Sequence, residues 1–158
     1  MTETSRPYIA VANRDDWETP HALFDSLWEK YEGFDLDPCG QSEVHYSAWR
    51  IVANGGKAYD GSTEALDGLT QPWHGKVFCN PPYGGGVYQW AKRCHDEVSS
   101  GGATLVVALL KSTTDVKWGW HFVEDCPYAS VQFIKGRLKF VGAKASAPFP
   151  SVIVTWQK

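Results

Sequence analysis

Residues 76–86 read KVFCNPPYGGG, which is an apolar run, a turn rich in proline, and a stretch of glycine. The run over 76–79 predicts a short buried strand. Asn80 and Pro81 each precede a proline, so both are kept out of the helical region and the turn is stiff. The three glycines then lead into a helix. A strand, a turn and a helix in this order place a ligand at the carboxyl end of the strand in open α/β sheets.

The turn itself carries groups that suit chemistry on a planar amine. Asn80 offers a side-chain carbonyl that accepts hydrogen bonds, and Pro81 offers a backbone carbonyl without a competing N–H group. Tyr83 adds an aromatic face at the same point, although a turn aromatic that covers the core is the alternative interpretation of this residue. A site of this kind works by orientation and electrostatics, without a covalent intermediate or a metal.

The chain before this turn predicts an arm, a helix and a strand. Residues 1–16 are polar and predict an N-terminal arm. Thr19 is predicted to be the N-cap of a helix, with Pro20 at the first helical position. The apolar stripe of this helix, which is expected to end at Gly33, consists of Leu23, Phe24, Leu27, Trp28 and Tyr31. Residues 34–37 read as a short strand, and Asp37 at its end suits either a cofactor site or a turn.

The chain after the turn alternates between helix and strand. One helical face is predicted from the spacing of Val87, Trp90, Ala91, Cys94 and Val98. The unbroken apolar run over 103–110 predicts a parallel strand covered on both faces. Thr113 or Thr114 is expected to cap a helix that carries Val116, Trp120 and Val123.

Two last strands are predicted over 129–134 and 151–156, with a further extended piece over 137–140 between them. Residues 41–75 leave room for a helix and at most two short strands, because glycines and a proline break any long period there. Taken together, the alternation predicts an α/β fold with a doubly wound sheet.

Length and charge limit the function classes. With 158 residues, a net charge of −3 and a pI near 5.9, the chain predicts one domain without a broadly basic, DNA-coating surface. The later cations are either a local basic strip or ordinary surface residues, and they include Lys111, Arg137, Lys139 and Lys144. No signal peptide or membrane-length apolar run is present, which predicts a soluble, cytoplasmic protein.

The four cysteines are predicted to be reduced, mostly buried thiols. They form no Cys-x-x-Cys pair and no metal-ligand rhythm with the histidines, so no metal site is expected. Cys39 and Cys79 adjoin the two best motifs, where they are interpreted as small apolar wall residues.

An ordered set of motifs resembles one enzyme family, the phage-type, Dam-like DNA N-6-adenine-methyltransferases that use S-adenosylmethionine. The resemblance rests on the sequences WETP at 17–20, FDLDPC at 34–39, DGL at 67–69, NPPY at 80–83, GRLKF at 136–140 and PFPS at 148–151. It therefore covers nearly the whole chain in order. Only Gly40 follows Asp37 and Pro38, where the usual first cofactor motif is richer in glycine.

The resemblance implies a fold, a cofactor and a set of site residues. The fold would be the Rossmann-like sheet of S-adenosylmethionine-dependent methyltransferases in a minimal single domain over 17–158, with the last strand antiparallel. The implied catalytic residues are Asn80, Pro81, Pro82 and Tyr83. The implied cofactor-binding residues are Trp17, Thr19, Pro20, Asp37, Pro38, Cys39 and Asp67.

The resemblance also implies a substrate, namely a flipped-out adenine in double-stranded DNA, in a phage or prophage protein of a bacterial host. Tyr83 would stack on this base, Phe149 or its rival Phe140 would be the second clamping aromatic, and Arg137 and Lys111 would contact phosphate. Arg137 paired with a buried carboxylate is the alternative. A homodimer is possible, and no membrane partner is expected. Trp73 and Trp118 are two further candidates for cofactor or nucleic-acid contact.

Two other functions stay open from the sequence. The same fold and cofactor could serve RNA adenine or protein glutamine, because similar tetrapeptides occur in those enzymes. A catalytically idle module that binds DNA is the third hypothesis, which the intact NPPY sequence disfavours.

Overall fold

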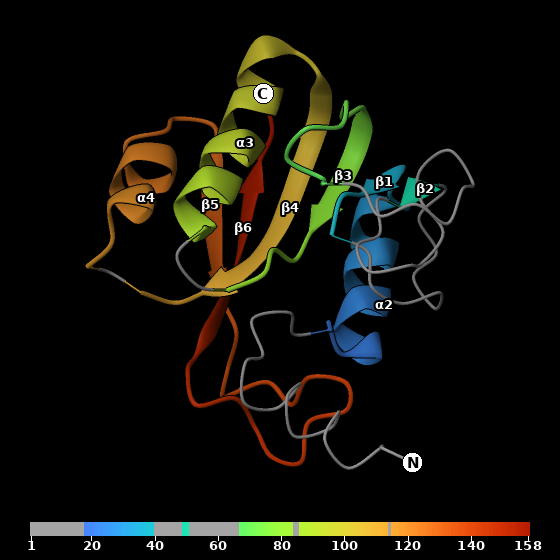
Figure 1. The fold of residues 1–158 in the computed structure, drawn as a ribbon, viewed down its shortest axis with the longest axis vertical. Helices are drawn as coiled ribbons and strands as arrows, with labels where there is room; N and C mark the ends of the chain where they lie inside the picture. The colour runs from blue at the N-terminus through green and yellow to red at the C-terminus, as the bar shows by residue number, and fades with distance from the viewer. Residues whose placement is uncertain (1–17, 40–48, 51–66, 84–85, 114) are drawn as a thin grey trace.

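The computed structural model describes residues 18–39, 49–50, 67–83, 86–113 and 115–158 (Figure 1). They form a mixed α/β structure around a six-stranded sheet with the order β2-β1-β3-β4-β6-β5. The strands are β1 (Leu36–Asp37), β2 (Trp49–Arg50), β3 (Gly75–Cys79), β4 (Ala103–Lys111), β5 (Ala129–Phe133) and β6 (Ser151–Trp156). The helical elements are α2 (His21–Tyr31), α3 (Val87–Ser100), α4 (Lys117–Gly119) and the π-helical turn η1 (Trp120–Glu124).

The sheet has the predicted topology, in which only the last strand runs against the others. β1 pairs in parallel with β2 and β3, and β3 pairs in parallel with β4. β6 lies between β4 and β5 and pairs antiparallel with both. This Rossmann-like arrangement confirms the predicted fold class. All the parallel strands therefore end at one edge of the sheet, where the motif residues follow them.

The sheet is covered on both faces, as the apolar run of β4 predicted. Alternate β4 residues belong to two separate clusters, with Val106 in the cluster under α3 and η1 and Val107 in the cluster under α2. The α3 face consists of Trp90, Ala91, Cys94 and Val98, all buried as predicted. The α2 face contributes Phe24 and Leu27, which pack against Phe78 of β3 and against Phe34, which precedes β1 because the strand predicted over 34–37 is limited to Leu36–Asp37.

The start of α2 differs from the prediction. Pro20 occupies the N-cap position and makes no side-chain cap hydrogen bond, although its backbone carbonyl accepts from the N–H of Phe24. The predicted cap, Thr19, is fully buried, and its hydroxyl bonds to Asn80 instead. The helix ends as expected before Gly33, because Glu32 and Gly33 both have positive φ.

The helix predicted over 114–123 is short and irregular. α4 has three residues and continues directly into η1, with Gly119 inside the helical stretch where a glycine is unfavourable. Thr113 does not cap it, since α4 begins at Lys117. The indole N–H of Trp156 donates to the carbonyl of Phe122 at 2.7 Å, which fixes η1 on the sheet.

The connection between β5 and β6 is a long loop over 134–150 that hangs below the sheet in Figure 1. The extended piece predicted over 137–140 lies in this loop and pairs with no strand. Val141 N–H of this loop donates to the carbonyl of Glu18, which precedes α2, and Ala147 N–H donates to the carbonyl of Leu138 within the loop. No helix within the described ranges has the length and apolar character needed to cross a membrane.

Candidate active site

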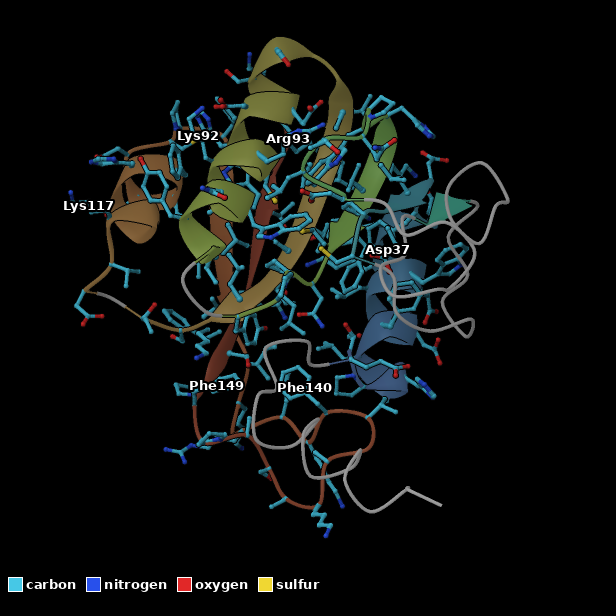
Figure 2. All side chains as sticks on the ribbon, viewed as in Figure 1. Asp37, Lys92, Arg93, Lys117, Phe140 and Phe149 are labelled. Atoms are coloured by element: carbon cyan, nitrogen blue, oxygen red, sulfur yellow. The ribbon has the colours of Figure 1, made fainter. Side chains whose placement is uncertain are left out.

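Three neighbouring strands deliver the motif residues to one edge of the sheet. Asp37 closes β1, Asn80 directly follows β3, and Lys111 closes β4. These strands are adjacent and parallel, so their carboxyl ends meet. This is the edge at which open α/β sheets bind ligands. Figure 2 places Asp37 at the β1 end of this edge, with Phe140 and Phe149 below it.

Asn80 is held by a residue that lies before α2. Its side-chain N–H donates to the hydroxyl of Thr19 at 3.0 Å, and both residues are buried. Because the amide nitrogen turns toward Thr19, the amide oxygen points the other way. Pro81 is buried beside it. Thr19 thus sets the orientation of the amide, a role that sequence reasoning missed because the two residues are 61 positions apart.

Asp37 forms a tight turn at the end of β1. Its carboxylate accepts a hydrogen bond from the N–H of Cys39 at 3.0 Å, and its side chain is buried. Pro38 is also buried, and Cys39 is half-buried. The turn role that the sequence left as the alternative for Asp37 is therefore present, and it shapes the 37–39 segment at the sheet edge.

The loop after residue 66 packs directly on this turn. Gly68 is buried against the backbone carbonyl of Pro38 and the ring of Trp90, which leaves no room for a side chain. Asp67 is exposed, and its carboxylate accepts from the N–H of Leu69 at 2.9 Å. The close approach of Gly68 brings the two acidic turns, at Asp37 and Asp67, to the same part of the edge.

Trp73 supports this loop from the core. It is buried, its indole N–H donates to the carbonyl of Gly68 at 2.8 Å, and the guanidinium of Arg93 lies 4.8 Å from its ring centroid. Arg93 also donates to the carbonyls of Leu69 and Gln71. These contacts give Trp73 a structural role in the loop, and its interpretation as a cofactor or nucleic-acid contact stays a prediction.

The cysteines behave as the sequence predicted. All four are free, and only Cys39 is partly exposed. The sulfur atoms of Cys39 and Cys79 lie 3.9 Å apart. Burial raises the pKa of the Cys39, Cys79 and Cys94 thiols, so they stay protonated and act as apolar wall residues. In the portion of the chain that the structure describes, no group of three or more ligand side chains could hold a metal ion.

Three aromatic rings meet at Tyr83, the last residue of the NPPY turn that begins with Asn80. The ring of Tyr83 meets Phe140 and Phe149 edge-on, with centroid distances of 6.3 and 5.4 Å. The ammonium of Lys111 lies 4.6 Å from the Phe149 centroid and 5.6 Å from that of Tyr83. The structure thus brings together four of the predicted substrate-binding residues, and we call this set the aromatic cluster (Tyr83, Lys111, Phe140 and Phe149).

Within the aromatic cluster, only Phe149 and Lys111 are partly open to solvent. Tyr83 is 2% exposed, and its hydroxyl donates to the carbonyl of Leu109 at 3.0 Å. Burial raises the pKa of Tyr83, so its phenol is neutral. Phe140 is 1% exposed. The ring of Tyr83 therefore lies in the core here, as the alternative interpretation held, and Phe149 is the more accessible of the two candidate clamps.

Arg137 is exposed in the loop over 134–150, as are Lys139 and Lys144. Among the residues that the structure describes, Arg137 makes no ion pair with a buried carboxylate, the alternative that the sequence left open. Trp17 lies outside the described residues.

Ser151 is a candidate site residue that sequence reasoning missed. It pairs with Lys111 across β4 and β6, so the two side chains share a face of the sheet. Its hydroxyl is buried and has no hydrogen-bond partner among the residues that the structure describes. The signal was present in the sequence, since Ser151 is a polar residue at the start of a strand that is otherwise almost entirely apolar.

Comparisons with known proteins complete the description. A family model described as DNA N-6-adenine-methyltransferase (Dam) matches residues 7–156. Solved structures similar to the chain include the human protein titled "Human methyltransferase 10 domain containing protein", with a TM-score of 0.49, 11% sequence identity, and coverage of 98% of this chain and 96% of that chain. No curated protein matches the chain significantly.

Proposed function

Because the chain belongs to the DNA N-6-adenine-methyltransferase (Dam) family and is a methyltransferase, we propose that it transfers a methyl group from S-adenosylmethionine to the N6 amine of adenine in double-stranded DNA. One observation carries the proposal. The amide of Asn80, at the carboxyl end of β3, is oriented by Thr19, and the NPPY turn that begins with Asn80 ends with Tyr83, the residue that contacts the other two rings of the aromatic cluster.

Asn80 and Pro81 act on the target amine. The lone pair of an exocyclic adenine nitrogen is delocalised into the ring, which makes it a poor nucleophile. The side-chain oxygen of Asn80 and the carbonyl of Pro81 accept the two hydrogens of this amine, and they draw electron density toward the nitrogen as the methyl group arrives. Such acceptors contribute by orientation and by electrostatic stabilisation of the developing charge. Pro82 stiffens the turn that holds both.

The acidic turns at Asp37 and Asp67 are assigned to the cofactor. A carboxylate accepts hydrogen bonds from hydroxyl and ammonium groups, which S-adenosylmethionine carries on its ribose and its methionine part. The packing of Gly68 on Pro38 holds the two turns together, so the residues present fit this cofactor. When bound, the cofactor supplies an activated methyl group on a sulfonium centre. Pro20, Pro38 and Cys39 line the same edge, and Thr19 acts there through Asn80.

The aromatic cluster is assigned to the flipped-out base. A base inside a duplex is out of reach, so it must leave the stack before its amine can meet Asn80. The ring of Phe149, which is partly exposed, offers the first stacking surface, while Tyr83 and Phe140 support it from the core. The buried hydroxyl of Ser151 adds a polar contact on the same sheet face. Lys111 contributes positive charge for phosphate at the entrance.

Two other acceptors and an idle module compete with this proposal. RNA adenine or a protein glutamine would use the same cofactor and the same acceptor groups on the enzyme, whereas an idle module would bind DNA without transfer. The decisive experiment incubates the purified chain with tritiated cofactor and, in parallel, plasmid DNA, RNA or bacterial lysate. Digestion of the labelled DNA to nucleosides then identifies the methylated base by mass spectrometry.

Label in N6-methyl-2′-deoxyadenosine from the DNA, lost in Asn80→Ala, is the expected result. Label that enters only RNA or a protein band would move the function to that acceptor. DNA retention without any transfer would support the idle module. Calorimetry with the demethylated cofactor product checks that Asn80→Ala still binds the cofactor, so that a folding defect is not read as a catalytic one.

A further inference from the structure

β5 is an edge strand that lacks the usual protection against pairing. It bonds to β6 on one side only and ends the sheet, as Figure 1 shows. Its sequence, ASVQF, contains no charged residue and no proline. Proteins that stay monomeric commonly place charges, prolines or bulges on such edges, because an open edge offers unpaired N–H and C=O groups to another strand.

The same strand carries exposed apolar side chains. Val131 is 43% exposed and Phe133 is 75% exposed. Over the described ranges, the only other large apolar side chain with comparable exposure is Tyr88 of α3, at 39%. Val131 and Phe133 point to one face of the sheet, since they alternate along the strand. This face of the edge is therefore apolar and open to solvent.

A groove runs beside these two side chains. It has a cavity volume of about 160 Å³, and its apolar wall is formed by Val123, Val131, Phe133, Val152 and Val154. An apolar cavity of about 150 Å³ is large enough to hold a benzene ring. The apolar surface of β5 therefore continues from the exposed strand into this groove, and an apolar strand of a second copy would cover it.

The two ends of β5 carry opposite charges, which favours pairing with a second copy of the same strand. Glu124 and Asp125 precede the strand, Lys135 follows it, and all three are exposed. In an antiparallel pairing of two β5 strands, the acidic start of one lies beside the basic end of the other. A parallel pairing would instead put like charges together. The charge pattern is therefore complementary to itself in the antiparallel arrangement.

From these observations we infer that β5 is the interface of a two-fold symmetric homodimer, in which a second copy of the chain pairs antiparallel with this strand. A two-fold axis at Val131 sets each Phe133 ring opposite the small side chain of Ala129 in the other copy and brings the two Val131 side chains together. The two six-stranded sheets then form one continuous sheet.

Sedimentation velocity over a wide range of protein concentration tests the interface. We expect a reversible monomer–dimer equilibrium in the wild-type chain. Phe133→Asp and Val131→Lys should each raise the dimer dissociation constant by about tenfold or more, because both remove apolar contacts and Val131→Lys also brings two like charges together at the axis. Tyr88→Lys is the matched control, since it changes an exposed aromatic residue away from β5 and should leave the equilibrium unchanged. Circular dichroism and thermal melts confirm that each variant is folded.

A charge swap separates this interface from a non-specific apolar contact. Lys135→Glu and Asp125→Lys should each weaken the dimer at low salt, and the double variant should recover part of the loss, because every pair is then opposite again. A chain that stays monomeric at every concentration would overturn the inference, as would a dimer that Phe133→Asp leaves intact. A monomer in which Phe133→Asp weakens DNA binding would assign the surface to DNA instead.

Discussion

Asn80 and Thr19 form the contact on which the catalytic assignment depends most closely. Both are buried, they are joined by one hydrogen bond, and they come from opposite ends of the first half of the chain. The rotamer of a catalytic amide is fixed by such a partner, and a small change of angle costs activity without loss of the fold. Thr19 therefore contributes to catalysis through its hydroxyl group, which orients the Asn80 amide, and not through the volume of its side chain.

Thr19→Val keeps the shape of the side chain and removes the hydroxyl. We expect the turnover number to fall by about fivefold, because one orienting hydrogen bond is worth about 1 kcal/mol, with little change in cofactor affinity. Thr19→Ser keeps the hydroxyl and should retain most of the activity. Steady-state kinetics with calorimetry measure both effects. Equal losses in the valine and serine variants would show that packing, and not the hydrogen bond, is what matters.

Tyr83 gives a second residue-scale prediction. Tyr83→Phe keeps the ring and loses the hydrogen bond to the carbonyl of Leu109, so we expect near wild-type transfer and a loss of stability of about 1 kcal/mol. Tyr83→Ala should cost about 3–5 kcal/mol, because it opens a cavity in the core. Urea unfolding and transfer assays read the two effects separately. A folded Tyr83→Phe enzyme without activity would assign the hydroxyl, and not the ring, to catalysis.

At the scale of elements, the sequence predicted what local patterns determine. The apolar run over 103–110 and the strand over 151–156 were found because burial on both faces leaves only apolar residues. Thr19 was misassigned as a cap since its sequence neighbours favour one, whereas its actual partner is distant along the chain. The burial of Tyr83 could not be predicted for the same reason, because Phe140 and Phe149, which cover its ring, come from a loop that is distant along the chain.

The loop that carries Gly68 packs on the 37–39 turn and so determines the shape of the proposed cofactor site. Gly68→Ala adds a methyl group where the carbonyl of Pro38 already lies, so the loop must move away from the 37–39 turn. We expect the dissociation constant for the cofactor to rise by about tenfold, with a smaller effect on DNA affinity. Gly86→Ala is the matched control, because an added carbon there meets nothing within 4 Å. Calorimetry with the demethylated product gives the comparison, and unchanged binding in a folded Gly68→Ala variant would place the cofactor elsewhere.

The whole molecule is acidic, yet the loop over 134–150 exposes Arg137, Lys139 and Lys144. Phosphate contacts from these three would carry much of the DNA affinity, which should fall steeply with added salt. Replacing all three by alanine should reduce the slope of log affinity against log salt by about 3. Fluorescence anisotropy at several salt concentrations measures the slope. An unchanged slope would move the phosphate contacts to another surface.

We expect the protein to recognise a short DNA sequence or to have weak sequence specificity, because the chain is small. Base reading needs several side chains that reach base edges in a groove, and the described elements include no segment that forms a separate recognition domain. Methylation mapped on a plasmid should therefore spread over many adenine contexts or follow a very short motif. A strict site of six or more base pairs would contradict this for one chain, and a palindromic site of that length would fit two copies that each read half.

The buried thiols predict how stability depends on pH. The pKa values of Cys39, Cys79 and Cys94 are raised by burial above the ordinary value of 9.0, so the native state keeps protons that the unfolded state releases. The free energy of unfolding should then be constant below pH 9.0 and fall above it, by about 1.4 kcal/mol per pH unit for each thiol. Urea unfolding between neutral and alkaline pH tests this, with Cys79→Ala expected to show a shallower decline. An alkaline limb of equal slope in both proteins would refute it.

The position of β6 has a consequence for how the protein is made. β6 is synthesised after every other strand, yet it occupies the gap between β4 and β5. While the ribosome is still adding residues before Ser151, β5 has no partner in the sheet. The loop over 134–150 is likewise anchored at only one end, so Phe140 and Phe149 cannot yet be brought to Tyr83. A nascent chain therefore has no competent pocket, and methyl transfer becomes possible only when the last strand has left the exit tunnel and entered the sheet.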